Sequence, residues 1–198
     1  MLLPRWRENL AILAANRAPG DQAVLAALGD ALWSERGSVA AAHAAYVLAG
    51  AAPQPFHPSA RVCLVGADHR RRPRTYATPE AIQRTELLEH ALSMANPQFV
   101  LAPFQPYKLH YAGLLSDCGR VKEALGYVEA VVRALKSLDR GCAECNVVRL
   151  TSVAAELEHR LRGHSGGKGG MLATAASSIF GGFSKMFDKG VHSLFGDE

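Results

Sequence analysis

The amino-acid sequence predicts an all-α protein, built as an α-solenoid of stacked antiparallel helical hairpins. Apolar residues recur at helical spacing along most of the 198 positions, and the segments that carry them end at glycine or proline. Alanine, which has the highest helix propensity, occurs 14 times in the first 50 residues. An internal repeat of two units favours a solenoid over a closed bundle.

Three helices are expected in the first 50 residues. The first carries its apolar side chains on one face: Trp6, Leu10 and Leu13. Asp21 is predicted to be the N-cap of the second helix. The side chains that this helix should bury are Val24, Leu25, Leu28 and Leu32. Gly37 is expected to end it and Ser38 to cap the third helix, so that two antiparallel helices join at one glycine.

The segment 51–77 is less regular, because prolines at 53, 55 and 58 forbid a continuous helix. The apolar run 61–66 would have no partner strand in a helical chain, so we expect a short helix or a buried loop there. Thr78, Pro79 and Glu80 combine a capping hydroxyl, a proline at the first position and an acid in the first turn, which predicts a helix start. The helix should run to about Ala95, with this buried stripe: Ala81, Leu88, Ala91, Leu92 and Ala95.

Three more helices follow the prolines at 97, 103 and 106. The first should end at Gly119, its partner at 121–135 is strongly amphipathic, and the last covers roughly 144–162. Residues 32–46 can be aligned with residues 114–128, which places Gly37 on Gly119 and Ala42 on Ala124. Each segment is therefore predicted to be a hairpin with a glycine turn. A small residue follows the glycine by five positions, where the helices should approach closely.

Composition restricts the class of protein. The net charge of +4 permits contact with an anionic surface but does not indicate nucleic acid. Four cysteines predict no disulfide framework and fit a reducing compartment. No uncharged apolar run reaches ~18 residues, so no membrane-spanning segment is expected. Residues 163–170 are predicted to be a Gly-rich linker between a helical domain, 1–162, and a tail, 171–198.

Two short motifs resemble catalytic or metal sites. Gly163–Gly167 matches the G-x-S-x-G string around Ser165, but a nucleophile elbow needs a strand before the serine, and a helix is predicted there. Cys142 and Cys145 form a lone C-x-x-C without the second pair that zinc requires. We therefore predict no catalytic residue, no cofactor and no metal site, and expect a protein that is not an enzyme.

Two segments are candidates for surface contacts. His69–Arg74 is the densest basic run, either a solvated loop or a contact with an acidic partner or anionic headgroups. Bulky residues in 171–195 recur at helical spacing between small polar ones, which fits packing on protein or an interfacial helix at a membrane. The candidate membrane-contacting residues are Ile179, Phe180, Phe183, Phe187 and Phe195.

Four strings carry a resemblance to a known family: Gly66–His69, Pro73–Glu86, Asn96–Phe99 and Pro103–Lys108. They closely resemble the Sec16 family, the scaffold proteins that organise COPII coat assembly at endoplasmic reticulum exit sites, and plant or algal members above all. The resemblance extends from Trp6 through Leu135 and more loosely into the tail.

The resemblance implies a fold and a set of partners. It implies the later part of a central conserved α-solenoid similar to an ancestral coatomer element, with its early helices missing. COPII coat proteins are the expected partners. Sec13 is among the partners that the resemblance implies, and we find no β-rich segment that could form the inserted β-blade through which the family binds it. Self-association through the exposed ends of the solenoid is a further expectation, and nucleic acid is not an expected partner.

The family strings also supply the candidate site. The candidate partner-binding residues are Arg74, Arg84, Phe99, Phe104 and Lys108. The prolines at 103 and 106 could instead set a fixed corner that the aromatic residues fill, and both interpretations stay open. The expected function is non-enzymatic scaffolding of COPII vesicles on the cytoplasmic face of the endoplasmic reticulum, with the Golgi as a second location. The alternative is a helical-repeat adaptor of another trafficking coat or tether.

Overall fold

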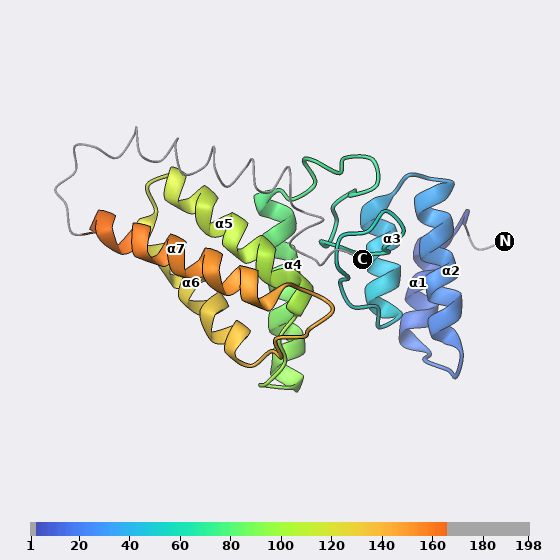
Figure 1. Cartoon of the computed structure of the whole chain (residues 1–198). Helices are drawn as coiled ribbons and strands as arrows, with labels where there is room; N and C mark the ends of the chain where they lie inside the picture. The colour runs from blue at the N-terminus through green and yellow to red at the C-terminus, as the bar shows by residue number, and fades with distance from the viewer. Residues whose placement is uncertain (1–2, 166–198) are drawn as a thin grey trace. The chain divides into compact units, whose positions relative to one another are not determined.

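Helices supply all the regular secondary structure of the residues that the structure describes. The computed structural model describes residues 3–165, which form seven α-helices, one 3₁₀ helix and no strand (Figure 1). The all-α prediction is confirmed. The elements are α1 (Trp6–Ala15), α2 (Asp21–Ser34), α3 (Val39–Leu48), α4 (Pro79–Ala95), the 3₁₀ helix η1 (Ala102–Phe104), α5 (Gln105–Asp117), α6 (Val121–Lys136) and α7 (Val147–Ser165).

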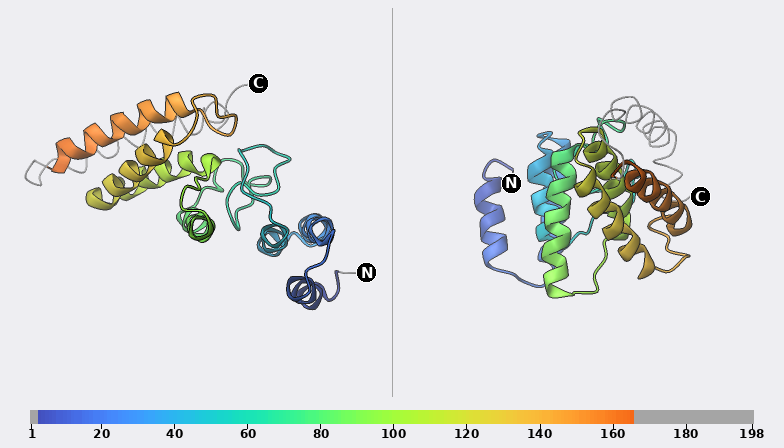
Figure 2. Two further views of the ribbon diagram at one scale, coloured as in Figure 1. Left: turned by 90° about the horizontal axis from the view of Figure 1, so that it is seen from below. Right: turned by 90° about the vertical axis from the view of Figure 1, so that its left-hand side faces the viewer.

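The chain divides into two compact units, residues 1–84 and 85–198, and the boundary falls inside α4. Each unit contains antiparallel helix pairs (Figures 1 and 2). In the first unit α2 packs against α3, and in the second α6 packs against both α5 and α7. The continuous solenoid over 1–162 stays a prediction.

In the first unit, a glycine turn joins α2 to α3 as the sequence predicts. Gly37 has a φ of 62°, which side chains with a Cβ rarely adopt, and its N–H donates to the Trp33 carbonyl at 3.0 Å. The two helices approach closely, because a Cβ on Gly29 would lie 2.5 Å from the Tyr46 ring. The buried side chains of this hairpin include Leu25, Leu28, Leu32, Trp33, Ala41, Ala42, Ala45 and Tyr46.

Two details of α2 differ from the prediction. The N-cap is Gly20, in the left-handed region, and Asp21 is the first helical residue. The Asp21 carboxylate faces the preceding turn, where it accepts from the Ala18 N–H at 3.3 Å and pairs with Arg17 at 2.6 Å. Val24 is 41% exposed, because it lies about 100° around the helix from Leu25, at the edge of the buried stripe.

The segment between α3 and α4 is a loop with its own buried side chains. The run 61–66 forms neither helix nor strand, and Val62, Cys63 and Leu64 are at most 1% exposed. The Gln54 N–H donates to the Val62 carbonyl at 2.7 Å, which ties the two arms of the loop together. The prediction of a buried loop is therefore confirmed, and the alternative of a short helix is wrong.

Helix α4 begins as predicted but buries a different face. The Thr78 hydroxyl accepts from the Ala81 N–H at 3.3 Å, which confirms the capped start. The residues that α4 buries are Ala81, Ile82, Thr85 and Glu89. Of the predicted stripe, Leu88 is half-buried and the other members beyond Ala81, namely Ala91, Leu92 and Ala95, are exposed. The stripe is wrong because Glu89 turns inward, where three groups of the second unit bind its carboxylate.

The second unit repeats the glycine turn. Gly119, with a φ of 76°, donates its N–H to the Ser116 carbonyl at 2.9 Å, and the Arg120 N–H reaches the Leu115 carbonyl at 2.8 Å. Ala124, like Ala42 in the first unit, is fully buried. The two glycine turns and the two small residues of the predicted repeat are therefore present.

Helix α7 begins and ends later than predicted. Asn146 accepts from the Arg149 N–H at 2.9 Å and so caps a helix that starts at Val147. Its buried side chains are Val147, Leu150, Ala154, Leu157 and Leu161. The helix continues through Ser165, so the first three positions of the predicted linker are helical, and the tail 171–198 lies outside the described residues.

Two glycines should respond to alanine substitution in opposite directions. Gly119→Ala should destabilise the chain by about 1 kcal/mol, because a Cβ at positive φ is strained although nothing lies within 4 Å of it. Gly126→Ala, inside α6 with equally open space, should stabilise it by about 0.5–1 kcal/mol. Urea denaturation of both variants measures the difference, and equal effects would contradict the turn geometry.

Candidate partner-binding surface

The segment 96–108 forms a corner whose aromatic residues point inward. Phe104 and Tyr107 are fully buried, with ring centroids 6.4 Å apart, and Phe99 is half-buried. The Phe99 N–H donates to the Asn96 carbonyl at 2.8 Å, which forms the turn after α4. The rings fill the corner, and this supports the structural interpretation of Phe104 over direct contact with a partner.

A buried polar network holds this corner to α4. We call it the Glu89 network: Glu89, Leu101, Gln105 and Lys108. One Glu89 carboxylate oxygen accepts from the Leu101 N–H at 3.2 Å and from the Gln105 amide at 3.1 Å, and Lys108 forms an ion pair with the same side chain. The Lys108 ammonium also lies 5.3 Å from the Phe104 ring centroid. Since both charged side chains are at most 13% exposed, each depends on the other for its counter-charge.

In the Glu89 network the Lys108 side chain is partly buried, with 13% of its surface exposed, and it points to Glu89 of the second unit. Sequence reasoning did not find Glu89 or assign a role to Gln105. The available signal was the position of Glu89, which follows Ile82 and Thr85 at helical spacing along one face of α4. An acid at the expected place of a buried apolar residue indicates a buried polar partner.

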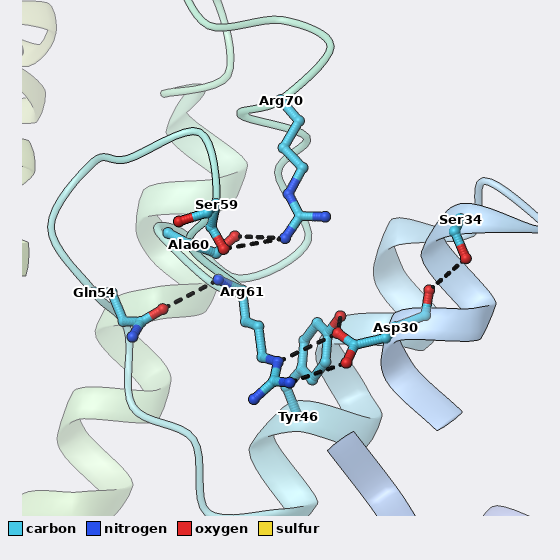
Figure 3. Close-up of polar contacts among 8 residues, drawn as sticks. All are labelled: Asp30, Ser34, Tyr46, Gln54, Ser59, Ala60, Arg61 and Arg70. Atoms are coloured by element: carbon cyan, nitrogen blue, oxygen red, sulfur yellow. Dashed lines mark hydrogen bonds and ion pairs between the residues drawn. The ribbon is translucent and has the colours of Figure 1, made fainter. Parts of the chain in front are cut away.

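In the first unit, the loop is bound to the α2–α3 hairpin by a fork of hydrogen bonds (Figure 3). The Arg61 guanidinium donates to both oxygens of Asp30, at 3.2 and 2.9 Å, and the Tyr46 hydroxyl donates to the same carboxylate at 2.6 Å. Burial acts to raise the pKa of Asp30, but the bonds from Arg61 and Tyr46 outweigh it and lower that pKa. Bidentate pairing of this kind fixes geometry as well as charge.

Arg70 also stabilises the loop of the first unit. Its guanidinium donates to the Ser59 and Ala60 carbonyls at 3.3 and 3.0 Å (Figure 3) and lies 4.1 Å from the centroid of the Trp33 ring. The predicted basic run therefore does not act as a whole, since one of its arginines stabilises the loop.

Arg74 and Arg84, the other two cationic candidates, are exposed. The Arg84 guanidinium lies against the loop, because a Cβ on Gly66 would come within 2.5 Å of its Nη1. Gly66 has a φ of 75°, so both the backbone and the neighbouring arginine favour glycine there. The structure therefore brings Arg84 to the loop of the first unit, while Phe104 and Lys108 lie in the second.

Two histidines are buried beside Trp33. The His43 and His69 rings lie edge-on to the Trp33 ring, with centroids 5.1 and 5.5 Å away, and each is 1% exposed. The His43 Nδ1 accepts from the Gly66 N–H at 2.9 Å, so its proton is on Nε2. Burial, with the nearby His69, lowers the pKa of His43 to about 4, and burial also lowers the pKa of His69. Both rings are neutral at neutral pH.

The two short motifs that resemble catalytic or metal sites lie in ordinary helix and loop surroundings. Ser165 lies in the last turn of α7, and no strand precedes it. Cys142 is partly exposed, Cys145 is buried, and burial raises the pKa of Cys145 to about 12. Among the residues that the structure describes, no group of three or more His, Cys, Asp or Glu side chains could hold a metal ion. Within that same range, no helix has the length and apolar character needed to cross a membrane.

The candidate membrane-contacting residues belong to the tail. Ile179, Phe180, Phe183, Phe187 and Phe195 lie outside the described residues.

The helix pairs, glycine turns and buried polar contacts define an all-α protein of antiparallel helical hairpins. A family model described as "Sec16 Sec23-binding domain" matches residues 1–192. The chain belongs to the Sec16 family, as the strings at 66–86 and 96–108 predict.

Several curated relatives resemble most of the chain. "Protein transport protein SEC16A homolog" of Arabidopsis thaliana is 44% identical over 195 residues, which cover 98% of this chain and 13% of that protein. Human "Protein transport protein Sec16B" is 37% identical over 161 residues, 77% of this chain and 15% of that protein. "COPII coat assembly protein SEC16" of Coccidioides immitis is 36% identical over 168 residues, 81% of this chain and 10% of that protein. No solved structure matches.

The Glu89 network should carry a large share of the stability of the second unit. Glu89→Ala should lower the free energy of unfolding by about 3–5 kcal/mol, because it leaves the Lys108 ammonium buried without a counter-charge. Glu156→Ala, which breaks the exposed ion pair with Arg160, should cost at most about 1 kcal/mol. Chemical denaturation compares the two, and a similar small loss in both would show that Lys108 is not buried in solution.

The buried histidines should make the fold sensitive to acid. A histidine with a lowered folded pKa leaves stability intact above the unfolded value of 6.5, and the loss grows as pH falls toward about 4, because only the unfolded chain takes up the proton in that interval. The free energy of unfolding should therefore fall from pH 6.5 to pH 4. His43→Gln should reduce that fall, whereas His159→Gln, at an exposed position of α7, should leave it unchanged. An unchanged pH profile in His43→Gln would contradict the burial of His43.

Proposed function

We propose that this chain is a scaffold segment for COPII coat assembly at endoplasmic reticulum exit sites, in transport from the endoplasmic reticulum to the Golgi. The observation that carries the proposal is the 44% identity over 98% of the chain to a protein named for protein transport. A second relative is named for COPII coat assembly. The chain spans 10–15% of the length of these relatives, so the proposal concerns the part that one segment plays.

The partner within the coat is Sec23 in this proposal, because the matching family description names Sec23 binding. The segment acts by presenting fixed helical and loop surfaces to that partner, without catalysing a reaction and without a cofactor. Paired glycine turns, the buried contacts of Glu89 and the exposed Arg61–Asp30 pair support this role, since they hold such surfaces in place before a partner arrives. The proposed place of action is the cytoplasmic face of the exit site, with the Golgi as a second location.

The candidate residues divide between two roles. Arg74 and Arg84 are exposed and are proposed to face a partner. Phe104 and Lys108 are proposed to shape the corner after α4, with Phe99 at its edge. Five tail residues are proposed to contact the membrane, with packing on protein as the competing outcome: Ile179, Phe180, Phe183, Phe187 and Phe195.

Binding of purified Sec23 to the immobilised full chain tests the proposal. We expect saturable binding that Arg74→Glu weakens about threefold to tenfold with an unchanged melting temperature, because an exposed charge at an interface contributes modestly. Lys108→Glu should instead lower the melting temperature, because it places two carboxylates together inside the second unit.

The same chain used as bait in a cell lysate separates the alternatives. Recovery of COPII subunits supports the proposal. Recovery of subunits of another vesicle coat, without COPII components, would contradict it and favour an adaptor of that other coat.

A further inference from the structure

The positive charge of this chain is concentrated in its first unit. Residues 1–84 contain ten arginines, no lysine and six acidic residues, a surplus of four positive charges. That surplus equals the net charge of the whole chain, so residues 85–198 are neutral as a set. The first lysine of the sequence is Lys108. The surplus of positive charge that would attract an acidic partner therefore belongs to the first unit.

Several of these arginines already have partners inside the unit. Arg61 is bound to Asp30, Arg17 to Asp21, and Arg70 to two loop carbonyls and the Trp33 ring. Others are exposed and less engaged. Arg71 has a long ion pair of 3.9 Å with Asp68. Within residues 3–165, no ion pair or side-chain hydrogen bond is found for Arg36, Arg72 or Arg74, and all three are exposed.

The backbone that carries these exposed arginines is fixed. The Asp68 carboxylate accepts from the Arg71 N–H and the Asp68 carbonyl accepts from the Arg72 N–H, both at 3.0 Å. The Thr75 N–H then donates to the Arg72 carbonyl at 3.1 Å, so two consecutive turns hold positions 68–75. His69, inside the first turn, and Tyr76, directly after the second, are at most 3% exposed and anchor the loop.

Arg71 extends this set to the α2–α3 turn. A Cβ on Gly37 would lie 3.1 Å from the Arg71 Nη1, so the guanidinium rests on the glycine that follows Arg36. We call Arg36, Arg71, Arg72 and Arg74 the arginine surface. It joins the loop and the turn of the hairpin within one unit.

We propose that the arginine surface binds an acidic peptide segment, rich in Asp and Glu, of a protein partner. Two features favour this occupant. All four cations are arginines, whose planar forks pair bidentately with carboxylates. The cations also project from fixed turns, which reduces the ordering cost of binding a defined segment. The identification of the partner as a COPII subunit rests on the proposed function, but the chemistry of the surface does not.

Fluorescence anisotropy with a fluorescein-labelled peptide of alternating glutamate and serine tests the proposal on the full chain. We expect binding that weakens as salt is added, because exposed charges are screened beyond a Debye length of about 10 Å at 0.1 M. The double variant Arg72→Glu/Arg74→Glu should bind about tenfold more weakly or not at all, because each change replaces an attraction by a repulsion. A peptide with lysine in place of glutamate should not bind.

The matched control is Arg133→Glu/Arg140→Glu, which makes the same change in net charge at two exposed positions of the second unit. It should leave peptide binding within about twofold of the parent, as expected when only local charge matters. Circular dichroism melting of both variants, and of Arg72→Ala/Arg74→Ala as a milder change, shows that the fold is retained.

Three outcomes would overturn the proposal. They are no peptide binding by the parent chain, an equal loss in the variant and in its matched control, and stronger binding to phosphatidylserine vesicles that disappears in Arg72→Glu/Arg74→Glu. The last would assign the surface to a membrane. Peptide binding that persists while Sec23 fails to bind would leave the arginine surface in place and reject only the proposed partner.

Discussion

Ion pairs that join an irregular segment to a helix are the constraint that arranges both units of the chain. Lys108 and Glu89 satisfy each other at the corner after α4, and they draw the Leu101 N–H and Gln105 into the same contact. Arg61 and Asp30 form an exposed bidentate pair that joins the loop to the α2–α3 hairpin. In both places a charged pair joins an irregular segment to a helix, where apolar periodicity alone would leave the connection undetermined.

The same constraint distinguishes arginines that are bound within the fold from arginines that are exposed to a partner. Arginines that are bound within the first unit hold its loop in place, and the loop in turn carries Arg71, Arg72 and Arg74 outward on fixed turns. A scaffold needs no reacting group; it needs surfaces whose shape and charge exist before binding. Membership of the Sec16 family and a charge surplus confined to residues 1–84 fit that requirement together.

Local signals in the sequence were sufficient where the interactions are local. The glycine turns at Gly37 and Gly119 and the capped start at Thr78 depend on residues within a few positions, and all three are confirmed. The buried face of α4 was not predictable in this way. Apolar spacing favours Leu88 and Leu92, whereas Glu89 turns inward because its partners lie between 12 and 19 positions further along the chain.

The candidate site shows the same division. Phe104 and Lys108 were selected because they belong to the family strings, and the structure places both in the interior of the second unit. A string shared with a family does not separate residues that shape a fold from residues that face a partner, since selection retains both. Arg74 was selected from the same strings and is exposed. The exposure of each side chain separates the two kinds of residue, and exposure depends on contacts that are distant in the sequence.

Hydrogen exchange of the full chain, free and bound to purified Sec23, tests the central claim most directly. Amide exchange reports which backbone segments a partner covers. We expect added protection at residues 67–78 and at the turn around Gly37, with α5, α6 and α7 unchanged. Protection confined to α5, α6 and α7, with no change in the loop, would contradict it.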